Sequence, residues 1–480
     1  MTNGEILITM CVYMALVIGI GLFFAKRANE SSDNYFIGGR SLGPLLAGTY
    51  INWLIVAKRL HAYSIVANDS ITIPDFFSNR YKEKNKIIMT LAAIFILVFF
   101  TIYASSCFVT VGKLFSTLFG FSYHSMMIGG AIFVILYTFL GGFLAESASD
   151  FMQGIVMFIA LTTLVVVSVA SAGGPGAILE NLKDIPGFLE FFGIASPQVS
   201  EGVQQLSLSG SPLFHQANPY GFLTILSTLS WGLGYFGVPQ VLLRFMAIRK
   251  NYEVKKSRRI AVTWCAISLF AAVFIGLIGR AIYPAELLTK SDAEGIFITL
   301  STNLLPTVIA GLAMAGILAA TISSSDSYLL IASSAVSKNI FQGIIYKKAS
   351  DKQIMLVTRI VLLLIAIIGV IIALDENSVI FTVVSFAWAG FGATFGPLML
   401  FSLFWKRTTR EGAIAGMLAG SIMVFIWKLV IRPLGGVVDI YELLPAFLTS
   451  CIAIIVVSLL TKAPSHEIKE EYERAKVFVD

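Results

Sequence analysis

The chain has little charge, little histidine and little cysteine for its length. Only 13% of its 480 residues are charged, and it contains four histidines and four cysteines. This share of charge is far below that of an ordinary water-soluble domain, so a bilayer is the expected environment. The net charge of +6 comes from Lys and Arg in loops, a pattern that sets membrane topology, and nucleic-acid binding is not expected.

The histidines and cysteines are too dispersed to form a reactive or metal site. None of them recurs at the spacing of metal ligands, of a disulfide framework or of a nucleophile and its base. They are His61, His124, His215 and His466, and Cys11, Cys107, Cys265 and Cys451. We therefore expect no enzyme activity and interpret the cysteines as packing residues.

Apolar sequence is abundant instead, with 57% hydrophobic residues and a mean hydropathy of +0.83. At roughly 20 residues per span, the pattern predicts an all-α polytopic membrane protein with about 11–12 transmembrane helices. The runs long enough to cross lie near 5–26, 87–112, 124–142, 149–172, 219–243, 259–283, 305–336, 354–374, 379–404, 412–431 and 441–461. We expect one integral-membrane domain over residues 1–462 and a cytoplasmic tail over residues 463–480.

Loop charges predict how the chain is oriented, because Lys and Arg gather in cytoplasmic loops. The basic linker 244–259 is predicted to be cytoplasmic, and the mainly acidic segment 173–218 is predicted to be an external loop. Alternation from these two segments agrees with the charges of every later loop.

The alternation fails near the N-terminus. The segment with Lys26, Arg27 and Arg40 is basic, and so is the segment 58–86, yet only the apolar run 42–57 separates them. This run is shorter than a crossing helix requires. Either it is a re-entrant or interfacial piece, or a helix is missing from this sequence; we favour the missing helix.

The string WGLGYFGVP, at 231–239, interrupts an otherwise strong span with three glycines and a proline. Broken membrane helices occur mainly where unwound backbone lines a cavity or binds an ion. Trp231 and Tyr235 are four residues apart and are predicted to share one face. Alternatively, the glycines permit close helix packing and the aromatic rings fill volume; we favour a binding site.

Hydroxyl and carboxyl groups interrupt the apolar run 316–334 at Ser323 to Ser327. Oxygen ligands of this kind suit a small hard cation. Ser323 and Ser327 share a helix face, with Ser324 beside them and Asp326 one residue off it. Serines alone often bond to the carbonyl one turn back, but a carboxylate at mid-span favours a functional role.

Two further side chains are candidates on weaker grounds. Asp150 lies at the start of a predicted span, where a carboxylate either faces an internal cavity or is stabilised by the helix dipole; the sequence supports both equally. Tyr103 is an aromatic residue with a polar group in mid-span, and by itself it indicates packing.

At these strings the chain resembles the sodium:solute symporter family, and within it the sodium/proline branch. The similar segments follow one another in order: YFIGGRSLGP (35–44), ITIPDFFSNRY (71–81), FFTIYAS (99–105), LYTFLGGFLA (136–145), WGLGYFGVP, LLRFMA, ILAATISSSDS and AWAGFGATFGP (387–397). Such a series is highly specific for the family and less specific for the solute.

The resemblance implies a core of two inverted five-helix repeats, with the ion and the solute near the midplane and alternating access between the halves. It implies a sodium-coupled symporter that imports proline or a related small amino-acid-like solute. Its expected partners are sodium, the solute and the lipid bilayer. We expect a monomer that crosses the bacterial plasma (inner) membrane many times.

The resemblance also implies roles for individual residues. For sodium these are the carbonyl of Ala320 and the side chains of Ser323 and Ser324. For a second sodium they are Asp150, Asp326 and Ser327. For solute contact and gating they are Tyr103, Trp231, Tyr235 and Pro239, and for sodium coupling Arg40.

The chain departs from the family pattern after GGRSLGP, where a broken helix normally follows. Residues 45–47 run directly into a segment that resembles the end of the next helix, so roughly 35 to 40 residues are absent, about one crossing and part of another. That helix would supply sodium carbonyls and half the solute cavity. The alternative function is therefore a non-transporting remnant or scaffold. Departures at Val238 and Gln240 weaken the assignment of proline itself.

Overall fold

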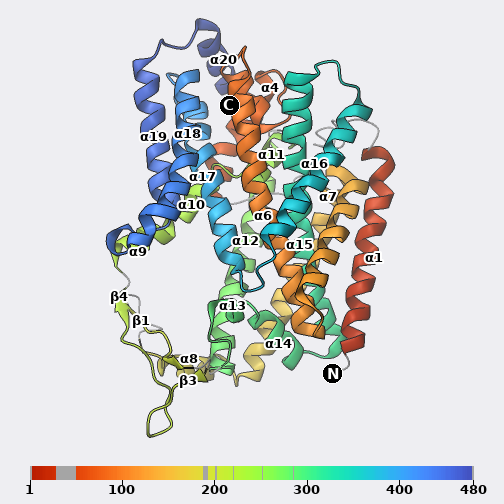
Figure 1. Cartoon of the computed structure of the whole chain (residues 1–480), viewed down its shortest axis with the longest axis vertical. Helices are drawn as coiled ribbons and strands as arrows, with labels where there is room; N and C mark the ends of the chain where they lie inside the picture. Colours follow the sequence, from red (N-terminus) through yellow and green to blue (C-terminus); the bar gives the residue numbers. More distant parts are fainter. Residues whose placement is uncertain are drawn as a thin grey trace.

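The computed structural model describes residues 3–28, 50–186, 193–200, 203–219, 221–250, 252–284 and 286–477. Most of these residues are helical, and the long helices run side by side along the longest axis of the molecule (Figure 1). We call the end that carries helix α20 (His466–Val477) the basic end, because Lys406 lies 3.8 Å from Glu473 of that helix. The opposite end, with the strands and α14 (Ile296–Leu304), is the ribbon end.

The elements follow in three groups along the chain. The first contains α1 (Asn3–Ala28), α3 (Tyr50–Asn52), the π-helix η2 (Trp53–Ala57), α4 (Lys58–Val66), α5 (Ile73–Arg80), α6 (Ile87–Phe119), α7 (Tyr123–Ser171) and α8 (Pro175–Lys183). The second contains β1 (Gly193–Ile194), β2 (Val199–Ser200), β3 (Val203–Gln204), β4 (Asn218–Pro219), α9 (Phe222–Leu229), α10 (Trp231–Gly234), α11 (Pro239–Met246) and α12 (Glu253–Ile282). The third contains α13 (Lys290–Ala293), α14 (Ile296–Leu304), α15 (Thr307–Ser334), η3 (Ala335–Ile345), α16 (Asp351–Ile372), α17 (Ile380–Phe404), α18 (Arg410–Ile426), η4 (Trp427–Ile431), η5 (Arg432–Leu434), η6 (Gly436–Val438), α19 (Leu443–Leu460) and α20 (His466–Val477).

Eight helical segments of the described chain are long and apolar enough to cross a bilayer. They are Ile87–Phe119, Ser149–Ser171, Glu253–Ile282, Thr307–Ile345, Asp351–Ile372, Ile380–Phe404, Arg410–Leu434 and Leu443–Leu460. Gly4–Gly19 and Tyr123–Phe139 are shorter apolar helices. Each coincides with a run predicted from hydropathy, so the prediction of an all-α polytopic membrane protein is confirmed.

Helix α7 contains two of the predicted spans. Its 49 residues would extend over about 70 Å if the helix were straight, about twice the thickness of the hydrocarbon core. The hydroxyl of Tyr137 lies 2.5 Å from Ser149 Oγ, although these residues are 12 positions apart and a straight helix would separate them by about 18 Å along its axis. The two parts of α7 therefore do not lie along one straight axis, and Tyr123–Phe139 and Ser149–Ser171 are two separate apolar stretches.

The predicted span 219–243 is broken into the three short helices α9, α10 and α11. Val238 is extended, with φ −74° and ψ 112°, and Pro239 follows as the first residue of α11, a position that needs no backbone N–H. A Cβ on Gly237 would lie 2.6 Å from Gly396 N of α17, so only glycine allows this approach. The break predicted from the glycines and the proline is present, and the glycines also serve close packing.

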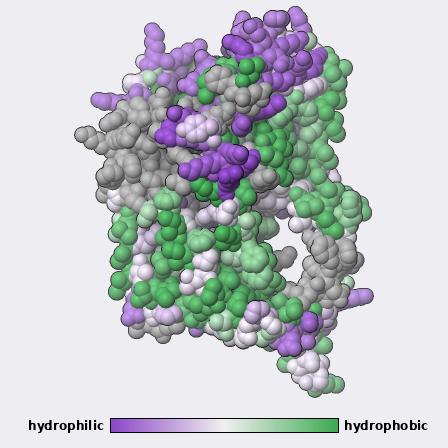
Figure 2. Space-filling view, turned by 180° about the vertical axis from the view of Figure 1, so that it is seen from behind, coloured by the Kyte–Doolittle hydropathy of each residue, from purple (hydrophilic) through white to green (hydrophobic). Residues whose placement is uncertain are grey.

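Helix α17 lies at the centre of the bundle and α12 at its edge. In the most apolar stretch of α17, 78% of the residues are buried inside the protein, whereas the corresponding share for α12 is 11%. Figure 2 shows hydrophilic side chains gathered over the basic end and hydrophobic side chains over most of the body below it. This distribution matches a protein whose sides face lipid and whose ends face water.

The segments predicted as loops of opposite sign lie at opposite ends of the bundle. The segment 173–218 contains α8 and two antiparallel ribbons, β1 with β4 and β2 with β3, at the ribbon end (Figure 1). The segment 244–259 contains the end of α11, the connection between the two helices and the start of α12. Because α12 ends beside α13 near the ribbon end, this segment lies at the basic end.

The short run 42–57 is described only from Tyr50 onward, where α3, η2 and α4 form one helical stretch. Trp53 is buried, whereas 58% of Ile51 is exposed. The predicted coupling residue Arg40 lies outside the described residues. The re-entrant piece and the missing helix, the two explanations of the failed charge alternation, therefore both stay predictions at this point.

Candidate functional site

A cavity of about 640 Å³ opens between α7, α11, α12 and α15. Its walls bring together five of the residues predicted for ion or solute binding. These are Asp150, Tyr235, Ser323, Ser324 and Ser327. They come from three separate segments of the chain, and we call this space the larger cavity.

An arginine that the sequence analysis treated only as a loop residue lies in the same wall. Arg244 of α11 donates from Nη2 to Asp150 Oδ2 at 2.5 Å and to Ser327 Oγ at 3.2 Å. The side chains of Arg244 and Asp150 are only 14% and 11% exposed. Asp150 is therefore a cavity residue with a charged partner, not only an acid at a helix terminus. An arginine just after the broken helix was the signal that could have identified it.

The serines of α15 make the backbone hydrogen bonds expected of membrane serines, and some of them also line a cavity. Ser323 Oγ donates to the Ala320 carbonyl at 3.2 Å, and Ser325 Oγ donates to the Thr321 carbonyl at 2.7 Å. Ser323 nevertheless lines the larger cavity, whereas Ser325 is fully buried away from it. One helix face therefore presents hydroxyl groups to the cavity, as the spacing predicted.

Asp326 lies off that face. Its side chain is 2% exposed and does not line the larger cavity, and its Oδ1 accepts the N–H of Ser327 at 2.8 Å. Of the second-sodium candidates, only Asp150 and Ser327 reach the larger cavity.

A second cavity of about 380 Å³ lies toward the ribbon end. Its walls include two of the predicted residues that the larger cavity lacks, Tyr103 and Ala320, and it shares Ser324. The ring of Tyr103 stacks on Tyr328, with 4.2 Å between their centroids. We call this space the smaller cavity.

Trp231 and Pro239 line neither cavity. Trp231 stacks between aromatic rings, with centroid distances of 5.3 Å to Phe381, 5.4 Å to Trp388 and 5.7 Å to Tyr441. Its carbonyl accepts from Trp388 Nε1 at 3.0 Å. Trp231 is thus packed among aromatic rings, whereas Tyr235, one turn later, lines the larger cavity.

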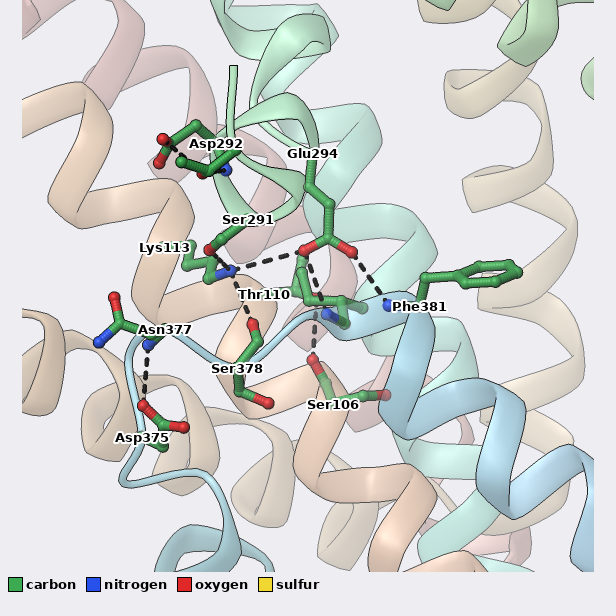
Figure 3. Close-up of polar contacts among 12 residues, drawn as sticks. Ser106, Thr110, Lys113, Ser291, Asp292, Glu294, Asp375, Asn377, Ser378 and Phe381 are labelled. Carbon is green, nitrogen blue, oxygen red and sulfur yellow. Dashed lines mark hydrogen bonds and ion pairs between the residues drawn. The ribbon is translucent and has the colours of Figure 1, made fainter. Parts of the chain in front are cut away.

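A charged cluster lies beside the smaller cavity, at the ribbon end of the bundle (Figure 3). Lys113 Nζ of α6 donates to Ser291 Oγ at 2.9 Å and to the Ser378 carbonyl at 2.8 Å, and it lies 3.5 Å from Glu294 Oε2. The same carboxylate accepts the N–H groups of Ile380 and Phe381 at 3.1 and 3.0 Å.

These are the first N–H groups of α17, which have no partner within the helix. A carboxylate at this position is favoured by the helix dipole. Ile380 also lines the smaller cavity. Glu294 therefore joins the α13–α14 segment to α17 beside that cavity, an arrangement that the sequence did not indicate.

The chemistry of the two cavities suits a small polar solute and a hard cation. Serine, threonine and tyrosine residues line them together with one aspartate, one glutamine and one arginine, and most of the other lining residues are apolar. Among the residues that the structure describes, no three His, Cys, Asp or Glu side chains converge in a way that holds a transition metal.

Comparison with known proteins agrees with the chemistry of the cavities. The model of the sodium:solute symporter family matches residues 35–420. The sodium/proline symporters of Staphylococcus aureus strains USA300 / TCH1516 and JH9 are each 35% identical to the chain, over 99% of this chain and 97% of the relative.

These alignments also bear on the length of the chain. They span 520 positions, whereas the chain has 480 residues, so at least 40 positions, the difference of the two, hold a residue of the relative only.

A solved structure shares the fold. A Na⁺-coupled sialic acid symporter, in a substrate-bound outward-open state, matches with a TM-score of 0.71 at 17% identity. The match covers 96% of this chain and 99% of that chain. At this identity the likeness concerns the arrangement of the helices and not the solute.

Proposed function

Because the chain belongs to the sodium:solute symporter family, we propose that it imports proline or a closely related small amino-acid-like solute together with sodium, by alternating access. It is a multi-pass membrane protein of a sodium-coupled transporter family, and sodium is its coupling ion. The solute, the direction of transport and the residues that bind are the parts proposed here.

The observation that carries the proposal is the larger cavity. It collects ion-binding candidates of α15, Asp150 of α7 and Tyr235 of the broken helix around one space. Polar side chains in a membrane protein are costly unless they face a cavity or a partner. Their convergence beside an interrupted helix supports a transport site.

We place the first sodium at the ribbon-end side of this α15 face. Its protein ligands would be the Ala320 carbonyl and the hydroxyls of Ser323 and Ser324. Ala320 lines the smaller cavity, Ser323 the larger, and Ser324 both. A cation bound here would lie between the two spaces, where each access state reaches it in turn.

A second sodium would compete with Arg244. The guanidinium already holds Asp150 and Ser327, which are the candidate ligands for that ion. Two cations cannot occupy one carboxylate side by side without repulsion. We propose that Arg244 and the second sodium bind there alternately, so that ion binding breaks the contact between α11 and α7.

For the solute we propose contacts with Tyr103 and Tyr235, since each lines one of the cavities. Trp231 and Pro239 would act on gating instead, by holding the two ends of the broken helix in place. Trp231 does so through Trp388 and its stacked neighbours, and Pro239 by beginning α11.

The ribbon end would face outward and the basic end the cytoplasm of a bacterial plasma membrane, as the charges of the loops indicate. The contacts of Glu294 with Lys113 and α17 would then close the external mouth of the smaller cavity. Breaking them would admit solute and sodium from outside.

The alternative is a non-transporting remnant of the same fold. The alignment with the relatives has 520 positions and this chain has 480 residues, so at least 40 residues of the relatives have no counterpart here. We propose that these residues belong to the absent core helix. Several oxygens must replace the hydration shell of sodium at once. A chain without that helix would leave the ion with too few ligands.

Uptake by purified protein in proteoliposomes separates the two functions. We expect labelled proline to accumulate when an inward sodium gradient is imposed and not when potassium replaces sodium. Binding of sodium or proline without accumulation would favour the remnant. Uptake that is independent of sodium would contradict the proposed coupling.

A further inference from the structure

Tyr328 of α15 stacks with two aromatic rings of α6 and lines both cavities. Its centroid lies 4.2 Å from that of Tyr103 and 5.3 Å from that of Phe100, and both pairs are nearly parallel, with interplanar angles of 27° and 22°. The side chain is only 5% exposed. Such stacking fixes the position of the ring.

The two cavities have three wall residues in common, Met157, Ser324 and Tyr328. Beyond these, the larger cavity is lined by the basic-end parts of α11 and α12, such as Arg244 and Trp264. The smaller cavity is lined by ribbon-end residues of α6, α14 and α17. The shared residues therefore lie between a space lined from the basic-end side and a space lined from the ribbon-end side.

Of these three residues, Tyr328 brings the largest rigid side chain. Its ring covers the face of Tyr103, so nothing else can stack on that face while the two rings are in contact. A solute that moves from one cavity to the other must pass the edge of this pair or displace one ring.

We propose that the ring of Tyr328, stacked on Tyr103, is the partition between the two access routes. The solute crosses by taking the place of one of the two rings on the face of the other. The proposal rests on the proposed transport function for its meaning, but the partition itself is a property of the fold. It makes Tyr328 a residue that determines which solutes pass, since only a solute flat or small enough to exchange with a phenol ring would do so.

Native cysteines report on the two sides of the partition. Cys107 lines the smaller cavity and Cys265 the larger one. We would retain one of them at a time, replace the other cysteines with alanine, and apply a charged, membrane-impermeant thiol reagent to each side of proteoliposomes with oriented protein, without sodium or solute.

With the native ring we expect reagent on the ribbon-end side to modify Cys107 but not Cys265, and reagent on the basic-end side to modify Cys265. Tyr328→Ala should open the wall, so that modification of Cys265 from the ribbon-end side becomes at least about tenfold faster, a change that corresponds to removal of a modest barrier. Tyr328→Phe retains the ring and should leave the protection unchanged.

Phe99→Ala is the matched control. Phe99 is a fully buried ring of the same helix as Tyr103, stacked on Phe425, and it lines neither cavity. Its loss should lower stability without exposing Cys265 to the ribbon-end side. If Tyr328→Ala is not recovered in membranes, Tyr328→Leu removes the planar ring and keeps most of the volume.

The proposal is overturned if removal of the ring leaves Cys265 protected from the ribbon-end side, or if Phe99→Ala exposes it equally. Failure to modify Cys265 from either side, with any residue at 328, would also overturn it, because there would be no water-filled space to divide. None of these results depends on uptake. If Tyr328→Ala changes the labelling of Cys265 as expected but the protein transports no proline, only the proposed transport function is rejected and the partition stands.

Discussion

Arg244 and Asp150 are 94 residues apart in the sequence, yet the guanidinium Nη2 lies 2.5 Å from the carboxylate Oδ2. The pair joins α11, the last part of the broken helix, to the second apolar stretch of α7, which begins at Ser149. Arg244 also donates to Ser327 of α15. Three segments that form the larger cavity are thus held by one side chain. Both partners are largely removed from solvent.

Replacement of Arg244 by methionine should therefore destabilise the protein and stop transport. Breaking a buried ion pair leaves an uncompensated charge and costs about 3–5 kcal/mol, although partial exposure places this pair near the lower value. The loss should be smaller in Arg244→Met combined with Asp150→Asn, which removes both charges. Thermal unfolding in detergent measures the effect.

Lys406→Met is the control for that measurement. Lys406 also forms an ion pair, with Glu473, but the two side chains are 64% and 50% exposed, and exposed pairs contribute about 0–1 kcal/mol. Equal destabilisation by Lys406→Met and Arg244→Met would show that the cavity pair is not special. A double variant no more stable than Arg244→Met would show that Asp150 needs no partner.

Sodium dependence should distinguish two neighbouring serines of α15. Ser324 lines both cavities, whereas Ser325 is fully buried and donates to the Thr321 carbonyl. We expect Ser324→Ala to raise the sodium concentration for half-maximal uptake at least about tenfold, the loss of one oxygen ligand worth about 1.4 kcal/mol. Ser325→Ala should leave it unchanged.

The cluster in Figure 3 predicts a change in access rather than in binding. Glu294→Gln keeps the shape of the side chain but removes the charge that faces Lys113 and the first N–H groups of α17. We expect the external mouth to open more often, so that Cys107 reacts several-fold faster with an impermeant thiol reagent added from the ribbon-end side. Slower labelling would contradict the closing role.

Asp292→Asn is a matched control for Glu294→Gln. Asp292 lies two residues earlier, on α13. Among the contacts of the described residues, its side chain bonds only with Thr289 of the same turn. It carries the same charge without a contact to α17. Its replacement should leave the labelling rate of Cys107 near that of the native chain.

Two glycines of the broken helix should respond differently to alanine. A Cβ on Gly237 would meet the backbone of α17, 2.6 Å from Gly396 N, whereas a Cβ on Gly232 would have no atom within 4 Å. Overpacking of this kind costs about 1–3 kcal/mol, so Gly237→Ala should lower the unfolding temperature and Gly232→Ala should not. Equal effects would mean that local flexibility, not packing, explains the glycines.

Local patterns were sufficient for the architecture. The spans could be predicted because the free energy of transfer into lipid adds up over about 20 consecutive residues, and the break at Pro239 because proline and glycine act on their own backbone. The grouping of Ser323, Ser324 and Ser327 on one wall follows from helix periodicity alone. The assignment of ligand roles to them stays a prediction.

What the sequence by itself determined is therefore the solvent, the spans, the interrupted helix and the family, all of which depend on neighbours along the chain. Only the tertiary structure decided that Arg244 faces Asp150, that Glu294 caps α17, that Trp231 packs while Tyr235 lines a cavity, and that Tyr328 lies between two spaces. The reason is physical: these contacts act over a few ångströms between segments that are far apart in sequence. No local pattern encodes which segments become neighbours.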